Sequence, residues 1–242
     1  MLPHARNARA GDRQANFLLA GQSNIGAWQE PENASALAAF REQFLSLSPN
    51  CSAVEFFPAF RGGSALLAEF ARLNAQEYAA DRKLCAQMKE NFWFDPASGR
   101  FGRPMEMALA RIERWRKKQG IAFRGIIWAQ GEADAIHLGD AHFEIYVRTL
   151  ETVLRRLQRL CDCECVYIQE LGQLLPPGGR ADAGAVLVRA AQRRVAAAMP
   201  GIEVATSTFD LPLRDTVHLT PQSHEIAARR MAKAIARSER PQ

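Results

Sequence analysis

Four polar segments of the sequence carry side chains that could together perform nucleophilic chemistry. They are GQSN at 21–24, RGGS at 61–64, QGEAD at 130–134 and DTVH at 215–218. Ser23 follows Gly21, which permits a tight turn that exposes the serine hydroxyl. That hydroxyl needs a base, and His218 is the candidate. Asp215 lies three residues before His218, so it can bind the second imidazole nitrogen and favour the imidazolium.

A serine that attacks a carbonyl also needs donors for the oxygen that becomes negative. The backbone N–H groups of Ser23 and Gly63 and the side-chain amide of Gln130 are the candidates. Taken singly, each group has a simpler interpretation, such as a helix cap, a glycine turn or an ordinary loop residue. Because they follow successive predicted strands, the catalytic interpretation is favoured for the set.

Short apolar runs that do not alternate with polar residues predict the strands of a parallel sheet buried on both faces. The predicted strands are Asn16–Ala20, Ala53–Phe57, Phe123–Ala129, Glu164–Leu171 and Ile202–Thr206. Helical patterns between them predict helices over Ser64–Tyr78, from Pro104 to Gly120, from Asp140 (as a cap) to Leu160, over Gly184–Met199 and over Gln222–Arg237. The fold class is therefore α/β, with ligands expected at the carboxyl ends of the strands.

The length and composition limit the other classes of protein. A chain of 242 residues that is 48% hydrophobic and 24% charged is typical of a globular protein, and we expect an N-terminal arm over 1–15 and one domain over 16–238. The net charge of +5 comes from arginines scattered along predicted helices, which favours solvated helix faces over nucleic-acid binding. No apolar run is long enough for a membrane span.

The N-terminus and the cysteines bear on the compartment. The basic start has no apolar signal core after it, and five cysteines cannot all pair, so we expect a cytoplasmic protein, with a shortened exported protein as the alternative. The alternating cysteines predict buried or half-buried thiols on one strand face rather than zinc ligands; they are Cys161, Cys163 and Cys165. We expect no metal, although a weak acid–imidazole set exists at Asp134, His137, Asp140 and His142.

Two further features of the sequence carry an expectation about burial. The aromatic run Phe92-Trp93-Phe94 is expected to lie in the core, with a wall of a sugar subsite as the less favoured alternative. His224 falls on the last predicted helix and is expected to be exposed. The sequence leaves the oligomeric state open.

The segments GQSN, GGS at 62–64, WAQGEAD at 128–134 and DTVHLTP at 215–221 resemble the blocks of the SGNH hydrolase superfamily. They are most similar to its sialate O-acetylesterase-like branch, carbohydrate esterase family 6, and the resemblance runs from Phe17 to Ile235. It implies a three-layer α/β/α sandwich with a mostly parallel, five-stranded, flavodoxin-like sheet. It also implies that the chain needs no cofactor and hydrolyses acetyl esters on sugars.

Position by position, the resemblance makes Ser23 the nucleophile, His218 the base and Asp215 its orienting partner. It assigns the oxyanion hole to Ser23, Gly63 and Gln130, with Gln130 standing where the superfamily usually has an Asn. The remaining residues of these blocks are expected to bind substrate or to support the site; they are Gln22, Asn24, Arg61 and Glu132.

Further expectations concern the supporting residues Glu132 and Arg61 and one departure from the family pattern, at Ile25. Glu132 is expected to be hydrogen-bonded beneath the active-site loops. Arg61 places a charge beside the glycine loop that could attract an anionic sugar, with a plain solvent-facing charge as the alternative. Ile25 stands where the family pattern would have Met, and both are apolar.

The expected function is therefore hydrolysis of O-acetyl esters on carbohydrates, either acetylated oligosaccharides or sialic acid-type substrates, through a Ser-His-Asp triad. The alternatives are a lipid or thioester hydrolase of the same superfamily, a sugar O-acetyltransferase, and a sugar-binding module that has lost catalysis. The sequence does not indicate which sugar or which hydroxyl position carries the acetyl group.

Overall fold

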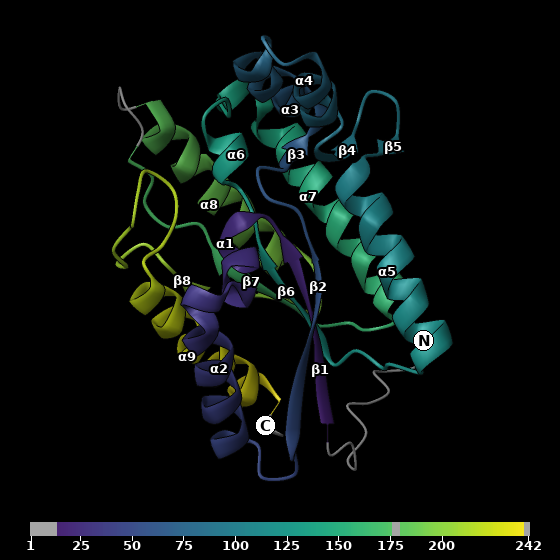
Figure 1. Cartoon of the computed structure of the whole chain (residues 1–242), viewed down its shortest axis with the longest axis vertical. Coiled ribbons are helices and arrows are strands. Elements are labelled where there is room, and N and C mark those ends of the chain that lie inside the picture. The colour runs from purple at the N-terminus through teal and green to yellow at the C-terminus, as the bar shows by residue number, and fades with distance from the viewer. Residues whose placement is uncertain (1–13, 176–179, 240–242) are drawn as a thin grey trace.

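A computed structural model of the chain describes residues 14–175 and 180–239, so most of the expected N-terminal arm lies outside the described residues. Its centre is a five-stranded sheet in the order β2-β1-β6-β7-β8, in which every neighbouring pair is parallel (Figure 1). The strands are β1 (Gln14–Gly21), β2 (Ala53–Phe60), β6 (Gly125–Ala129), β7 (Val166–Glu170) and β8 (Ile202–Ser207). All five predicted strands are confirmed.

Helices cover both faces of this sheet, as the resemblance implied. One face carries α1 (Ser23–Gly26), α2 (Ala34–Leu47) and α9 (Pro221–Ser238), and the other carries α5 (Arg103–Gln119), α7 (Asp140–Cys161) and α8 (Arg180–Ala198) (Figure 1). Side chains of β1 alternate between the two layers: Phe17 and Leu19 pack into one core, and Leu18 and Ala20 into the other. The fold is thus the three-layer α/β/α sandwich.

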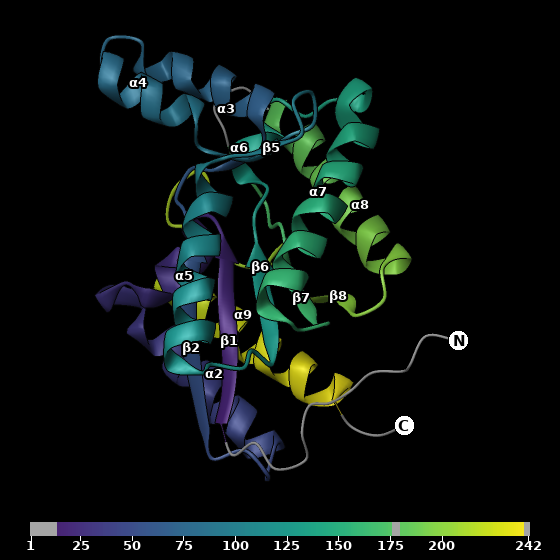
Figure 2. The same cartoon turned by 90° about the vertical axis from the view of Figure 1, so that its right-hand side faces the viewer.

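A small lobe stands at the end of the sheet where the strands finish (Figure 2). It contains β3 (Ala65–Leu67), α3 (Ala68–Asn74), α4 (Arg82–Lys89), β4 (Phe92–Asp95) and β5 (Arg100–Phe101), and β3, β4 and β5 form a second sheet. The shorter helices of the chain are α6 (Glu132–Ala135) and the 3-10 turns η1 (Ala27–Gln29), η2 (Pro31–Asn33) and η3 (Ala75–Tyr78).

The helix predicted over Ser64–Tyr78 is wrong in its first turn. Ala65–Leu67 form a strand, and the helix begins only at Ala68. The backbone N–H groups of Leu66 and Leu67 donate to the carboxylate of Asp134, which holds them in an extended conformation. A distant carboxylate therefore overrides the helical spacing of the leucines.

The predicted helix ends are confirmed in one case and corrected in another. Pro104 lies in the first turn of α5, and Gly120 ends that helix in the left-handed conformation. In contrast, Gly139 occupies the N-cap position of α7, and Asp140 is the first helical residue and makes no side-chain cap. Its carboxylate still lies in the first turn, where negative charge is favourable.

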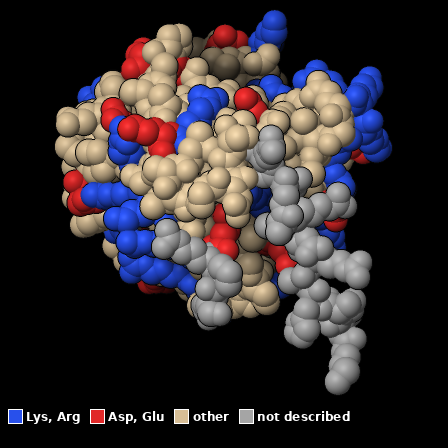
Figure 3. Space-filling model, turned by 90° about the horizontal axis from the view of Figure 1, so that it is seen from below, with Lys and Arg blue, Asp and Glu red and all other residues tan. Residues whose placement is uncertain are grey.

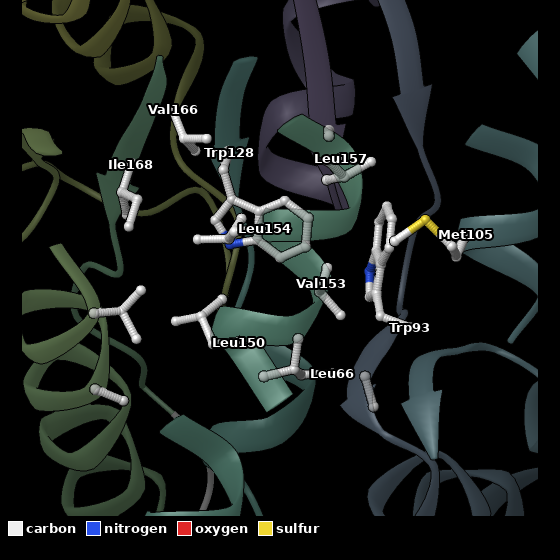
Figure 4. Packing of buried hydrophobic residues seen from close by; sticks show 14 of the residues in the cluster. Leu66, Trp93, Met105, Trp128, Leu150, Val153, Leu154, Leu157, Val166 and Ile168 are labelled. Carbon is white, nitrogen blue, oxygen red and sulfur yellow. The ribbon is translucent and has the colours of Figure 1, made fainter. Parts of the chain in front are cut away.

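The aromatic run at the start of β4 belongs to the core, as expected. Phe92 and Trp93 are fully buried, and the Trp93 ring meets Trp128 of β6 edge-on at 4.9 Å between ring centroids. Figure 4 shows these two indoles among Leu66, Leu150, Leu154 and other side chains of the same cluster. The lobe is therefore joined to the central sheet by tightly packed apolar side chains.

The burial of the cysteines follows the sequence expectation, but their predicted placement on one strand face is wrong. Cys161 is buried and Cys163 and Cys165 are half-buried, all as free thiols. Cys161 ends α7, and Cys163 and Cys165 precede β7 and pack into opposite layers of the sandwich. On the face seen in Figure 3, Lys and Arg side chains lie interspersed with Asp and Glu.

The described residues form neither a cluster of metal-ligating side chains nor a membrane-spanning helix. Within residues 14–175 and 180–239, no three His, Cys, Asp or Glu side chains gather closely enough to hold a metal ion. Over the same ranges, no helix has both the length and the apolar composition to cross a membrane.

Replacing Gly21 by Ala is expected to destabilise the fold strongly. Gly21 has φ +126°, and a Cβ there would overlap the carbonyl group of Ala129 on the neighbouring strand. Backbone strain and overpacking together should cost at least about 2 kcal/mol of unfolding free energy, measured by urea titration. Gly139→Ala is the control, because its φ is −127° and its Cβ would meet no atom within 4 Å. Equal stability of the two variants would contradict the assigned contact.

Candidate active site

The candidate site forms where β1, β2 and β6 end side by side. Gln22 donates its backbone N–H to the carbonyl of Ala129 at 2.9 Å, and Arg61 donates its own to the carbonyl of Gly21 at 3.1 Å. The turn that carries Ser23 is thus held on one side by the end of β6 and on the other by the end of β2. Parallel strands bring these segments together because their carboxyl ends share one edge of the sheet.

Ser23, His218 and Asp215 form one hydrogen-bonded chain, as the sequence predicted for their types and spacing. His218 Nε2 lies 3.1 Å from Ser23 Oγ, although the two residues are 195 positions apart. His218 Nδ1 lies 2.8 Å from Asp215 Oδ2 and 3.1 Å from Oδ1. An imidazole that donates from Nδ1 to a carboxylate has Nε2 free to accept the serine proton. This arrangement would allow His218 to take the proton of the Ser23 hydroxyl.

The hydrogen bonds around Asp215 favour its ionised form. Its Oδ1 accepts the backbone N–H groups of Val217 and His218, each at 2.8 Å. Partial burial raises the pKa of this carboxyl, but the two backbone donors and the His218 imidazole outweigh that effect and lower the pKa to about 2. Asp215 is therefore ionised near neutral pH, and it can balance the charge of a protonated His218.

Asn24 ties the serine turn to the loop that carries the histidine. Its Nδ2 donates to the carbonyl of Val217 at 3.0 Å, and its Oδ1 accepts the N–H of Leu219 at 3.2 Å. These two backbone groups flank His218 on either side. Asn24 therefore fixes the position of the imidazole relative to Ser23, its own neighbour in the chain.

Two further residues of the expected site lie beneath it. Glu132 is 5% exposed and accepts a second hydrogen bond from Asn24 Nδ2, at 2.5 Å, while its Oε2 has no partner. Burial raises the pKa of Glu132. Gln22 Oε1 accepts the N–H groups of Gly131 and Ala133, at 3.3 and 3.5 Å. Glu132 thus lies beneath the active-site loops as expected, and Gln22 is buried and supports the neighbouring loop.

Two backbone donors of the expected oxyanion hole are free. Among the described residues, neither the N–H of Ser23 nor that of Gly63 donates to a protein acceptor. Gly63 has φ +62°, the left-handed conformation that glycine adopts readily. A free N–H in a loop next to a serine is the kind of donor that a developing oxyanion requires.

The side chain of Gln130 makes more hydrogen bonds within the protein than the sequence suggested. Its side-chain Nε2 makes a short hydrogen bond to Asp134 and a longer one, of 3.3 Å, to the carbonyl of Ser64. Its Oε1 accepts the hydroxyl of Tyr146 at 3.4 Å. Of the expected oxyanion donors, it is the one whose hydrogens already have protein acceptors.

Asp134 is a site residue whose role the sequence did not assign, although it lies in the WAQGEAD block. It is fully buried and accepts the N–H groups of Leu66 and Leu67 together with the Gln130 amide. Burial raises its pKa to about 7, although the hydrogen bonds act in the opposite direction. Its hydrogen bonds anchor β3 and Gln130. The signal for it was its position four residues after Gln130, in the short helix α6 that follows.

His224 is buried, contrary to the expectation that it would be exposed. Its side chain is 1% accessible, and its Nδ1 has no partner among the described residues. Burial, with the nearby charges of Arg214 and His218, lowers its pKa to about 4, so it is neutral at pH 7. The two histidines of the weak acid–imidazole set contact other groups: His137 bonds Asn74, and His142 packs edge-on against Phe70.

Comparisons with known proteins give one family and several related folds. The family model described as carbohydrate esterase, sialic acid-specific acetylesterase, matches residues 29–237, a span that includes Asp215 and His218 and begins after Ser23. No curated protein sequence matches the chain.

Solved structures with the same fold share little sequence with the chain. A protein of Arabidopsis thaliana is similar at 17% identity, with a TM-score of 0.59 over 94% of this chain and 99% of the other. A carbohydrate acetylesterase of Xanthomonas citri is 14% identical, with a TM-score of 0.54 over 93% of this chain and 57% of the other. The lipase Lip_vut3 from a goat rumen metagenome is 13% identical, with a TM-score of 0.52 over 91% and 97%.

Replacing Asn24 by Ala is expected to lower both stability and turnover. The change removes the bonds to Val217 and Leu219 and leaves Glu132 buried without its donor, at a cost of about 2–4 kcal/mol. Because the imidazole is no longer fixed, kcat for an aryl acetate should fall by at least about tenfold in protein that is still folded.

Asn16→Ala is the matched control for this prediction. Asn16 lies near the opposite end of β1, is itself buried, and makes two part-buried side-chain hydrogen bonds, to Ala122 and Gln14. It should lose stability while kcat stays unchanged. A folded Asn24→Ala enzyme with full kcat would show that Asn24 does not position His218.

Proposed function

Because the chain belongs to the carbohydrate esterase family of sialic acid-specific acetylesterases, and is therefore a carboxylic ester hydrolase, we propose that it removes O-acetyl groups from carbohydrates by a serine mechanism. The observation that carries the proposal is the continuous chain of hydrogen bonds from Ser23 through His218 to Asp215. It lies beside two backbone N–H groups without protein acceptors. This combination provides a nucleophile, its base and a place for the oxyanion.

In the first half of the reaction, Ser23 Oγ attacks the acetyl carbonyl while His218 Nε2 takes the serine proton. The carbonyl π electrons move to oxygen, which gives a tetrahedral oxyanion. That intermediate collapses when the bond to the sugar oxygen breaks, and the sugar hydroxyl leaves with the proton that His218 returns. Asp215 stays ionised throughout and stabilises the imidazolium, in keeping with its low pKa.

In the second half, water replaces the sugar. His218 removes a proton from water as the water oxygen attacks the acetyl-enzyme, and the second tetrahedral intermediate expels Ser23. The serine oxygen recovers the proton from His218, and acetic acid is released, which gives its remaining proton to the solvent to become acetate. The free enzyme is regenerated with each atom accounted for, and no redox step occurs.

The oxyanion in both halves is placed against the N–H groups of Ser23 and Gly63. We assign a third contact to Gln130, through the amide hydrogen that makes the longer 3.3 Å bond to Ser64 in this structure. The shorter bond to Asp134 would hold the amide in position during that exchange. Loss of one such donor commonly reduces turnover by about 10²–10³.

Replacing Ser23 by Ala tests the nucleophile. We expect an intact fold and a loss of aryl acetate hydrolysis on the order of 10⁴ or more, because no other hydroxyl of the described residues is bonded to His218. The measurement is acetate release from 4-nitrophenyl acetate, acetylated xylo-oligosaccharides and O-acetyl sialic acids, with circular dichroism as the control for folding. Retention of activity by pure Ser23→Ala protein would exclude the serine mechanism.

Replacing Asp215 by Asn tests the orienting carboxylate. The amide oxygen can still accept the N–H groups of Val217 and His218, so the loop should keep its conformation. An amide NH₂ facing Nδ1, however, favours the tautomer whose proton lies on Nε2, the atom that must accept from serine. We expect kcat to fall by about 10⁴ with little change in stability. A small effect on kcat would mean that Asp215 serves only as a turn residue.

A further inference from the structure

Arg61 is a half-buried cation without a counter-ion, directly beside the glycine loop of the proposed active site. It follows β2, and its backbone N–H bonds to Gly21, two residues before Ser23. Two residues later comes Gly63, a proposed oxyanion donor. Among the described residues, no carboxylate lies within ion-pair distance of its guanidinium. The positive charge of Arg61 is therefore available to attract a negatively charged ligand.

The guanidinium is held in a fixed direction by a buried amide. Arg61 Nε donates to Oδ1 of Asn91 at 2.9 Å, and Asn91 is 1% exposed. The Nδ2 of the same amide donates to the carbonyl of Gly62 at 3.1 Å. Asn91 therefore ties the Arg61 side chain to the backbone of the glycine loop. It also lies against Gly63, where an added Cβ would be 3.8 Å from its Nδ2.

The outer edge of the guanidinium has no strong acceptor. Nη1 contacts only the thioether sulfur of Met107, at 3.5 Å, and Nη2 has no acceptor among the described residues. A thioether is a weak acceptor, so the donors on this edge are unsatisfied. In contrast, Arg214, on the loop that carries Asp215 and His218, is paired with Glu32 at 2.7 Å. Of these two arginines, Arg214 is neutralised by a carboxylate, whereas Arg61 has no carboxylate partner among the described residues.

On the basis of the proposed esterase function, we propose that Arg61 binds a carboxylate on the alcohol part of the substrate and so selects acetyl esters of acidic sugars over neutral ones. A planar guanidinium with a free edge pairs with a carboxylate through two parallel hydrogen bonds. Asn91 is the positioning residue that gives the fork its direction. The acetyl group is too small to carry the charge, which places the carboxylate on the sugar.

The test is the ratio of kcat/KM for two matched esters. The probes are monoacetylated methyl glucuronoside and methyl glucoside with the acetyl group on the same hydroxyl, so that they differ at C6 only. We expect the wild-type enzyme to favour the acid by at least about tenfold, mainly through KM, and the preference to weaken with added salt. Arg61→Met should bring the ratio close to one, and Arg61→Lys should retain part of it.

Arg155→Gln is the control for loss of one positive charge, because Arg155 is an exposed residue on the second half of α7. It should leave the ratio unchanged. The proposal is overturned if the wild-type enzyme shows no preference, or if Arg61→Met lowers kcat/KM equally for both esters, as a merely structural role would.

Failure of the esterase function itself gives a different result. It would appear as absence of aryl acetate hydrolysis, or as its persistence in Ser23→Ala. If the enzyme hydrolyses aryl acetate but neither glycoside, inhibition of that reaction by unacetylated methyl glucuronoside and methyl glucoside makes the same comparison. Stronger inhibition by the acid that is lost in Arg61→Met supports the assignment, and equal inhibition overturns it.

Discussion

The site depends on the close contact of β1 and β6 at Gly21. No side chain fits between Gly21 and the carbonyl of Ala129, and the next residue, Gln22, donates to that same carbonyl at 2.9 Å. Gly21 also accepts from Arg61 on the other side. One glycine therefore joins three of the four polar segments, because its missing side chain lets the strand ends approach and its φ of +126° turns the chain toward Ser23.

The fourth segment, which carries Asp215 and His218, does not end a strand of the sheet and is held by side chains instead. Asn24 and Glu132 are both buried, and buried amides and carboxyls are costly unless they are hydrogen-bonded. The backbone of Val217 and Leu219 satisfies Asn24 only when the loop lies over the serine turn. The need to satisfy this buried amide thus couples folding of the loop to alignment of the proposed triad.

Much of this arrangement could be predicted from local patterns. The strands are non-alternating apolar runs, and the polar residues that follow them are visible in the sequence. Helix α2 was missed, although Ala36, Phe40 and Phe44 repeat at helical spacing and are buried. In contrast, the strand Ala65–Leu67 could not be predicted from a local pattern. The partner that holds it extended is Asp134, which lies 67 or more residues away in the sequence. Likewise, the engagement of Gln130 and the burial of His224 depend on tertiary contacts with no local signature.

Two carboxyl groups lie near His218, and their surroundings separate their roles. Asp215 is partly exposed, and two backbone N–H groups and the imidazole lower its pKa to about 2. Glu132 is buried with one bonded oxygen, and burial raises its pKa. A protonated His218 can therefore draw its stabilising charge from Asp215, at 2.8 Å from Nδ1, while Glu132 acts through Asn24. Because their environments differ, Asp215 can stabilise the positive charge of the imidazolium, while Glu132 helps to position Asn24.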